Sequence, residues 1–206
     1  MRAVIFGYFG TLTDPGAADY REPLAHRTGE LLGVCRPRFW EALAGSFGER
    51  TIGVHGGTES TLRAVALSCG ANPSSAQLPV VLADHRSGYA RLCKPRHHAF
   101  GVLAELRRGG LRIGLLSDCG AELAECWTPT AFVPLVFSWQ ERCRKPDPRL
   151  HAPVARRHAV HRREVLATNA LVPGRRGTGS TPMTRSVSTR WTIRPACCPR
   201  WAAPGR

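Results

Sequence analysis

The sequence predicts an α/β fold: a parallel sheet with an inserted helical segment, followed by a disordered basic tail. Three observations lead to this prediction: an apolar strand pattern at residues 2–6, a stretch of purely helical periodicity at 15–93, and alternating strands and helices at 94–164. Strands that alternate with helices indicate a parallel sheet covered on both faces. The chain of 206 residues, 43% of them hydrophobic, is long enough for one core that carries an insert.

The first strand is expected at residues 2–6, where an apolar run leads into a turn. The sequence around it, at 3–14, reads AVIFGYFGTLTD. A short apolar run bounded by turn residues is typical of a buried strand. The loop from Gly7 to Thr11 is therefore expected at the edge of the sheet, and residues 1–14 form the first part of the predicted core.

Residues 15–93 are predicted to form a helical cap, because no strand pattern interrupts them. One predicted helical face consists of Phe39, Trp40, Leu43 and Phe47. A second helix is expected over 58–67, with Gly70 as its stop signal. Ser74 and Ser75 can cap a third helix.

Residues 94–164 are predicted to complete the core. In order, the expected elements are a helix at 100–106, a strand at 111–116, a helix at 121–126, a strand at 133–137 and a helix at 148–158. Ligands of open parallel sheets bind beyond the carboxyl ends of the strands. The loops at 7–11 and 117–118, which follow the first two strands, are therefore expected to face one cleft.

Residues 165–206 form a tail with seven arginines and no acidic residue, within a chain of formal net charge +14. The tail has no sustained period of a helix or strand, so it is predicted to be disordered. A shifted reading frame in GC-rich DNA would produce such a composition. Binding to nucleic acid is less favoured, because only Trp191 and Trp201 supply aromatic rings and no binding fold accompanies them.

The composition also indicates where in the cell the protein is expected and whether its cysteines bind a metal. No apolar run of about 18 residues predicts a membrane span, and no signal-peptide pattern opens the chain, so a cytoplasmic location is expected. The eight cysteines form no Cys-x-x-Cys pair and are interpreted as reduced thiols rather than metal ligands.

Three motifs now stand in a characteristic order: AVIFGYFGTLTD at 3–14, RIGLLSDCG at 112–120 and RKPDP at 144–148. They resemble the motifs of the haloacid dehalogenase-like (HAD) hydrolase superfamily, in its branch with a helical cap between the first and second motifs. The resemblance covers residues 1–164 and implies a Rossmann-like core. It also implies hydrolysis of a small phosphate ester or a haloacid-type substrate through a covalent aspartyl intermediate.

The first motif departs from the pattern of the family. Its register places Gly7 where the family has the nucleophilic Asp, and Phe9 where phosphatase branches have the Asp that acts as general acid and base. Phe9 has precedent in the family, whereas Gly7 has no side chain that can attack. Gly10 and Thr11 match the family loop, and Thr11 is expected to bind substrate.

The other motifs imply further site residues. Ser117 and Asp118 match the second motif and are expected to bind the phosphate or carboxylate of the substrate. Lys145 matches the lysine of the third motif, which neutralises developing negative charge. The fourth motif supplies carboxylates for Mg²⁺, the metal expected for the family, but the last acidic residue here is Glu164, which comes too early. No metal ligand is therefore predicted, and binding of Mg²⁺ is in doubt.

Ordinary structural roles remain open for the same residues. Gly7 suits close approach of the backbone at the end of a strand, Ser117 suits a turn, and a lone lysine such as Lys145 is most often solvated. Three functions follow: a HAD-like hydrolase that is inactive or impaired, a non-catalytic domain of this fold that binds a ligand or a protein, and a nucleic-acid binder that uses the tail. The first takes a small-molecule substrate.

Overall fold

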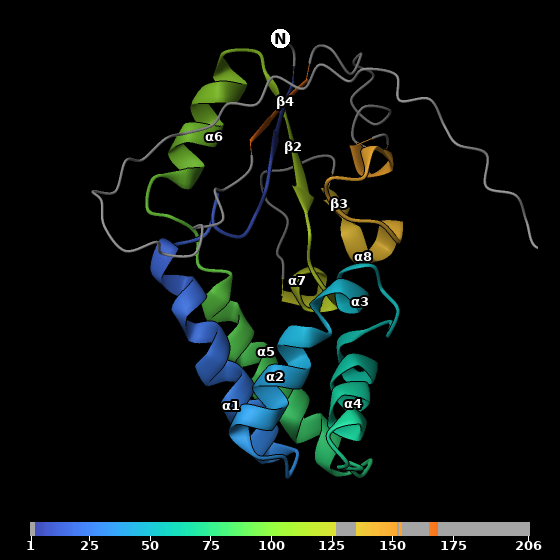
Figure 1. The fold of residues 1–206 in the computed structure, drawn as a ribbon. Helices are drawn as coiled ribbons and strands as arrows, with labels where there is room; N and C mark the ends of the chain where they lie inside the picture. The colour runs from blue at the N-terminus through green and yellow to red at the C-terminus, as the bar shows by residue number, and fades with distance from the viewer. Residues whose placement is uncertain (1–2, 127–134, 152, 154–164, 169–206) are drawn as a thin grey trace, which may run out of the picture.

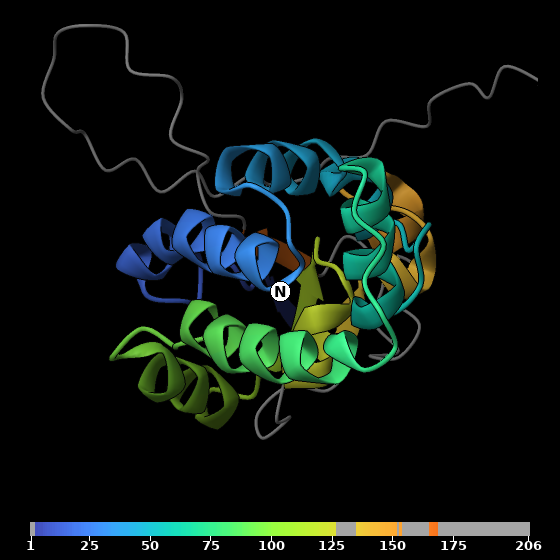
Figure 2. The same cartoon turned by 90° about the horizontal axis from the view of Figure 1, so that it is seen from below.

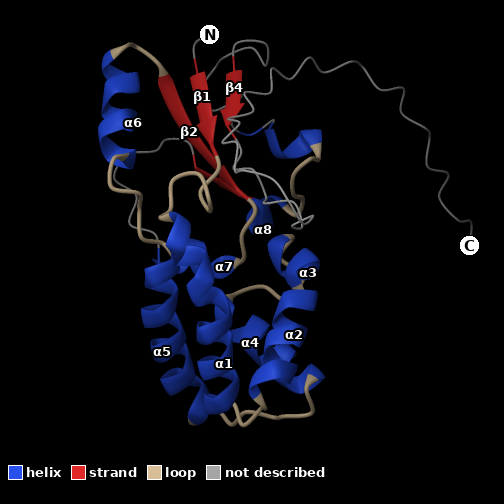
Figure 3. Cartoon of the chain, turned by 60° about the vertical axis from the view of Figure 1, so that its left-hand side comes forward, coloured by secondary structure: helices blue, strands red, loops and turns tan. Residues whose placement is uncertain are grey.

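A computed structural model describes residues 3–126, 135–151, 153 and 165–168 of the chain. Four parallel strands form one sheet in the order β3-β2-β1-β4. They are β1 (Ala3–Phe6), β2 (Arg112–Ser117), β3 (Leu135–Phe137) and β4 (Val165–Thr168). All four run toward the helical part of the molecule (Figures 1 and 3). The predicted α/β fold with a parallel sheet and an inserted helical segment is confirmed.

The register places the ends of the strands at one edge. Phe6, the last residue of β1, pairs with Leu115 of β2 on one side and with Thr168 of β4 on the other. β2 extends two residues further, and Ser117 pairs with Phe137 at the end of β3. The loops that follow β1, β2 and β3 therefore leave the sheet next to one another.

The sheet separates two apolar layers, as the alternation of side chains in strands requires. Val4 and Phe6 point into one cluster with Leu115 and with Leu103 of α6 (Ala99–Arg108). Ile5 points the other way, into a cluster completed by Leu116, Val136, Cys143 and Leu150. Leu150 lies in the 3₁₀ helix η2 (Pro148–His151). Both faces of β1 and β2 are thus covered by other parts of the core.

Between β1 and β2 lie the helices of the cap. They are η1 (Pro15–Tyr20), α1 (Arg21–Leu31), α2 (Arg36–Gly45), α3 (Phe47–Thr51), α4 (Thr58–Ser68) and α5 (Gln77–Leu92). α1 packs against α2 and α5, and α4 packs against α2 and α5 (Figure 2). The cap has an apolar core of its own, in which Phe39 and Leu62 are fully buried. The N-cap of α5 is Ala76 and not Ser74 or Ser75 as predicted, although the N–H of Gln77, the first residue of the helix, does donate to Oγ of Ser74 at 3.1 Å.

The cap and the core are joined by two chain segments that lie side by side. The N–H of Asp14 donates to the carbonyl of Lys94 at 2.9 Å, and the N–H of Arg96 donates to the carbonyl of Leu12 at 2.8 Å. Thr13 and Pro95 form an antiparallel bridge between them. The segment that enters the cap is therefore fastened to the segment that leaves it.

The structure corrects the sequence interpretation at three points. Residues 165–168, expected to begin the tail, form β4, because this apolar Val-Leu-Ala-Thr segment pairs with the free side of β1. Phe47 is 40% exposed rather than on the buried face of Phe39, because α2 ends at Gly45 and α3 begins a new helix. The expected helix at 148–158 begins as the 3₁₀ helix η2 instead.

The rest of the tail, 169–206, and the start of the strand expected at 133–137 lie outside the described residues. Two further helices of the core are α7 (Ala121–Cys126) and α8 (Ser138–Glu141). Within the described part of the chain, none of the helices is long and apolar enough to cross a membrane.

Candidate active site

The loop that follows β1 is held in one tight conformation. Gly7 is buried and comes directly after the last strand residue. The carbonyl of Tyr8 accepts hydrogen bonds from the N–H groups of Thr11, Leu12 and Thr13 at 2.8 to 3.3 Å. Gly10 has φ +72°, a left-handed conformation that favours glycine. The sequence at this turn is thus the one that the backbone requires.

Arg96, in the segment that leads from the cap back to the core, holds this loop by hydrogen bonds. The Nε of Arg96 donates to the carbonyl of Thr13 at 3.1 Å, and its Nη2 donates to the carbonyl of Gly10 at 2.8 Å. The hydroxyl of Tyr8 donates to the carbonyl of Cys93 at 2.6 Å. The shape of the candidate catalytic loop is therefore tied to the junction with the cap.

Phe9 occupies an aromatic and cationic environment. Its ring contacts Tyr8 edge-on with centroids 5.3 Å apart, and Tyr89 of α5 edge-on at 6.2 Å. The guanidinium of Arg21 lies 5.1 Å from the centre of the Phe9 ring. Burial raises the pKa of Tyr89 well above its ordinary value, so this phenol is neutral at physiological pH. Neither Phe9 nor Tyr89 therefore supplies a proton near neutral pH.

The hydroxyl of Thr11 is a buried polar group without a hydrogen-bond partner among the described residues. Buried polar atoms are nearly always hydrogen-bonded, so an unpaired one marks a place where water or a ligand binds. The substrate contact that the resemblance implies for Thr11 stays a prediction.

The loop after β2 is anchored to the segments that follow β3. Ser117 is 2% exposed and closes the strand. The N–H of Cys119 donates to Oγ of Ser138 at 3.0 Å. Asp118 accepts a hydrogen bond from the backbone N–H of Lys145 through Oδ1 at 3.1 Å. The second and third motifs are therefore in direct contact, because the Asp118 carboxylate accepts a hydrogen bond from the backbone of the third motif.

Lys145 is half-buried, and burial lowers the pKa of its ammonium group while the negative charge of Asp118 partly opposes that effect. A partly desolvated cation attracts an anion more strongly than a solvated one. Such a lysine beside the end of a strand suits the charge-neutralising role implied by the resemblance.

Two charged residues near this loop were missed by the sequence analysis. Glu122 of α7 is 5% exposed at its side chain, and its Oε1 lies 3.6 Å from Nη1 of Arg50, which is 14% exposed and comes from α3 of the cap. Burial raises the pKa of Glu122, and Arg50 opposes that rise. The only signal in the sequence is an acid just after the second motif; nothing in the sequence pairs it with Arg50.

The described residues do not fit a Mg²⁺ site. Among them no group of three or more Asp, Glu, His or Cys side chains is placed to hold a metal. Mg²⁺ requires an octahedral set of oxygen ligands that usually includes carboxylates. At the strand ends Gly7 and Phe9 supply no side-chain oxygen, Asp118 already binds the backbone of Lys145, and the sequence beyond β4 contains no acid.

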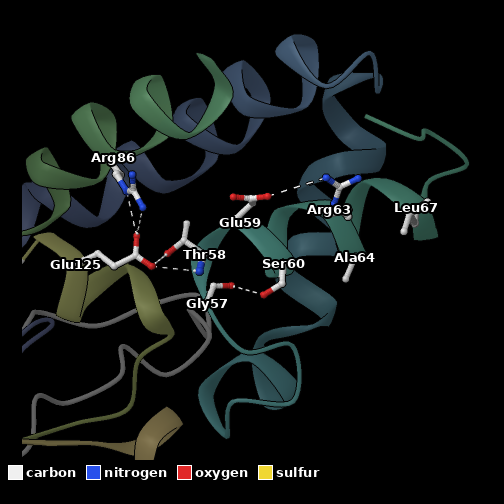
Figure 4. Close-up of a pocket in the computed structure, with 9 residues that line it drawn as sticks. All are labelled: Gly57, Thr58, Glu59, Ser60, Arg63, Ala64, Leu67, Arg86 and Glu125. Atoms are coloured by element: carbon white, nitrogen blue, oxygen red, sulfur yellow. Dashed lines mark hydrogen bonds and ion pairs between the residues drawn. The ribbon is translucent and has the colours of Figure 1, made fainter. Parts of the chain in front are cut away.

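An open pocket of about 390 Å³ lies elsewhere, between the cap and α7. Its lining residues are Gly57, Thr58, Glu59, Ser60, Arg63, Ala64, Leu67, Arg86 and Glu125 (Figure 4). None of them belongs to the three motifs. The carboxylate of Glu125 in its wall is already hydrogen-bonded to Thr58 and Arg86, so the pocket is not the candidate active site.

Among known proteins, only comparison with solved structures gives matches to this chain. No family profile and no curated protein sequence matches the chain. Solved structures do match. A HAD family enzyme from Bacteroides thetaiotaomicron is 14% identical with a TM-score of 0.54, over 81% of this chain and 83% of that one.

Two further similar structures have different ligands. L-2-haloacid dehalogenase from Xanthobacter autotrophicus, with chloropropionic acid covalently bound, is 23% identical with a TM-score of 0.52, over 81% of this chain and 69% of that one. CbbY from Rhodobacter sphaeroides, in complex with xylulose-(1,5)bisphosphate, is 15% identical with a TM-score of 0.53, over 81% and 76%. The fold of this chain is therefore that of the haloacid dehalogenase-like proteins.

Proposed function

We propose that this chain is a HAD-like hydrolase by architecture whose covalent chemistry is impaired. The observation that carries the proposal is Gly7, which is buried directly after β1 where the resemblance places the nucleophilic carboxylate. Attack by a side-chain carboxylate is the step that splits the reaction into two easier ones. Glycine offers no atom for that attack, so the first covalent step has no path.

The surroundings of this position favour a haloacid-type substrate over a phosphate ester. Displacement of a halide needs no general acid, because the halide leaves with the bonding electron pair and does not take a proton. An alkoxide leaving from a phosphate ester needs one. Phe9 stands at the acid position, enclosed by Tyr89 and Arg21, and provides no proton.

Three other groups support the binding of a small anion. Thr11, in the loop after β1, has a hydroxyl without a partner among the described residues. Ser117 is the buried last residue of β2. The half-buried Lys145 is hydrogen-bonded through its backbone to Asp118, just after β2. Hydroxyl donors and a desolvated cation are the groups that recognise phosphate or carboxylate.

The test is a paired assay of the purified chain as written. Inorganic phosphate release from a generic phosphomonoester and chloride release from 2-chloropropionate are followed with and without Mg²⁺. We expect neither product above the background of the uncatalysed reaction. Robust phosphate release would overturn the interpretation of Gly7.

A second candidate function is supported by Thr11: a non-catalytic domain that binds a small anion. Inorganic phosphate and 2-chloropropionate are titrated by calorimetry against the chain and against Thr11→Val. We expect binding that weakens in Thr11→Val. The matched control is Thr51→Val, because the Thr51 hydroxyl in the cap already donates to the carbonyl of Phe47 at 2.8 Å. Equal loss in both variants would assign the effect to stability.

The third function, nucleic-acid binding by the basic tail, is tested by removing residues 169–206. The cut is placed after Thr168 because β4 belongs to the sheet. Binding to DNA that falls with salt and disappears in the shortened chain would favour this function. Binding that is unchanged would reject it.

A further inference from the structure

The short helix α7 of the core reaches the cap through the carboxylate of Glu125. Its Oε1 accepts hydrogen bonds from the backbone N–H of Thr58 at 3.2 Å and from the Thr58 hydroxyl at 2.8 Å (Figure 4). Thr58 is the first residue of α4, and the residue before it, Gly57, has no side chain that can cap the helix. The first N–H groups of a helix need an outside acceptor. Glu125 supplies it from another part of the fold.

The second oxygen of the same carboxylate binds a second cap helix. Arg86 of α5 donates to Oε2 of Glu125 through Nε at 3.0 Å and Nη2 at 2.8 Å. Burial alone would raise the pKa of Glu125, but the hydrogen bonds from Thr58 and Arg86 outweigh it and lower the pKa. One ionised side chain therefore joins α7 of the core to both α4 and α5 of the cap.

Glu122, three residues earlier on α7, makes a second and more buried contact with the cap. Its carboxylate lies 3.6 Å from the guanidinium of Arg50. Arg50 is itself held in place, since it donates to the carbonyl of Leu43 at 3.0 Å and to Oγ of Ser46 at 3.1 Å. A carboxylate paired with a fixed guanidinium sets the distance between α7 and α3.

We propose that α7 is a latch that holds the cap against the core, with Glu122 and Glu125 as its two points of attachment. α7 begins at Ala121, directly after the short loop that carries Asp118 and follows Ser117, the last residue of β2. A shift of that loop moves both carboxylates relative to the cap. The latch therefore couples the loop after β2 to the position of the cap, whether or not the chain catalyses a reaction.

The test compares Glu125→Ala with Asp84→Ala by hydrogen–deuterium exchange. Asp84 is a matched control, because it also accepts hydrogen bonds from an arginine, Arg27, at 2.7 and 2.8 Å, and is 21% exposed against 29% for Glu125. The Asp84 pair lies wholly within the cap, between α1 and α5. It therefore reports the cost of losing such a pair without loss of a contact to the core.

In Glu125→Ala we expect faster exchange in the first turn of α4 and at the N–H groups of Asp14 and Arg96, which bridge the two connecting segments. The expected acceleration is about tenfold, the equivalent of about 1.4 kcal/mol. In Asp84→Ala these sites should keep their rates. Acceleration confined to α4, equal acceleration everywhere, or the same response in both variants would overturn the latch. If Glu125→Ala does not fold, Glu125→Gln keeps an acceptor for Thr58 but loses the charge opposite Arg86, so faster exchange is then expected at Asp14 and Arg96 rather than in α4, and unchanged rates at those two sites would overturn the latch.

Discussion

Asp118 and Lys145 are joined by a hydrogen bond of 3.1 Å from the backbone N–H of the lysine to the carboxylate of the aspartate. This contact joins residues of two motifs that are 27 positions apart in the sequence, and it fixes the segment that carries the lysine beside the end of β2. The carboxylate also opposes the effect of burial on the pKa of the Lys145 ammonium. One side chain therefore contributes both to the position and to the charge of another.

Replacement of Asp118 by Ala should destabilise the chain by about 1–2 kcal/mol, because it leaves the partly buried N–H of Lys145 without its acceptor. The measurement is the free energy of unfolding in urea. Asp147→Ala is the control: its carboxylate accepts a similar bond from the N–H of Arg149 at 2.9 Å, but in an exposed turn, so the loss should be smaller. Equal effects would show that the contact between the motifs has no special weight.

Gly7→Asp alone should not establish Mg²⁺-dependent phosphatase activity. The substitution returns a nucleophile after β1, but Phe9 still provides no acid and the sequence beyond β4 provides no carboxylate for the metal. Halide release is the exception, because that reaction needs neither group. Phosphate and chloride release by the variant are measured side by side. Phosphate turnover that depends on Mg²⁺ would contradict the conclusion that the described residues do not fit a Mg²⁺ site.

Acid should weaken the fold through His85. Burial, followed by the nearby charge of Arg50, lowers the pKa of His85 to about 4, and its Nδ1 lies 2.9 Å from the hydroxyl of Thr28. The unfolded chain takes up this proton at a pH near 6.5, before the folded chain does, so stability is lost as the pH falls from about 6.5 toward 4. A fall in pKa from 6.5 to about 4 corresponds to about 3 kcal/mol at full protonation.

His85→Phe keeps a buried ring without a titrating group, so it should remove most of that pH dependence. Urea unfolding at a series of pH values between 7 and 4 gives the comparison. His97→Phe, at an exposed position, should follow the original chain. An unchanged pH profile in His85→Phe would mean that other groups account for the acid sensitivity.

Gly53→Ala should destabilise far more than Gly33→Ala. Both glycines have a left-handed backbone, with φ +72° and φ +74°, so each substitution carries about 1–2 kcal/mol of backbone strain. A Cβ at Gly53 would also lie 2.3 Å from the carbonyl oxygen of Trp139 in the core, whereas one at Gly33 meets nothing within 4 Å. The extra cost is about 2 kcal/mol or more. Thermal or urea unfolding measures the difference, and equal losses would show that the cap does not rest on Trp139.

Local patterns in the sequence were sufficient to predict those helices and strands whose apolar periodicity or capping residues lie within the element itself. The apolar run of β1, the run of β2 that ends at Ser117 and the start of α4 at Thr58 all lie where the patterns place them or within a residue or two. These elements depend on periodicity and on capping residues that are neighbours in the chain. β4 was missed because four residues of weak pattern become a strand only beside β1.

The contacts within the candidate site were less accessible, since they join distant residues. The resemblance singled out Thr11, Ser117 and Lys145 as site residues, which stays a prediction, but it did not indicate that Asp118 accepts a hydrogen bond from the Lys145 backbone. Nor did it indicate that Glu125 would cap a helix that begins 67 residues earlier. Such pairs arise from the three-dimensional arrangement, and no periodic pattern in a single sequence indicates which distant residues will meet.

The paired segments at Thr13 and Pro95 also bear on how this architecture can be altered. The chain leaves the sheet and returns to it at almost one point, and the helices between have an apolar core of their own. The entropic cost of closing a loop rises only slowly with its length, by about 0.6 kcal/mol for each doubling. We therefore expect the cap to be exchangeable: a short turn joining Thr13 to Pro95, or a different insert, should preserve the order of the strands.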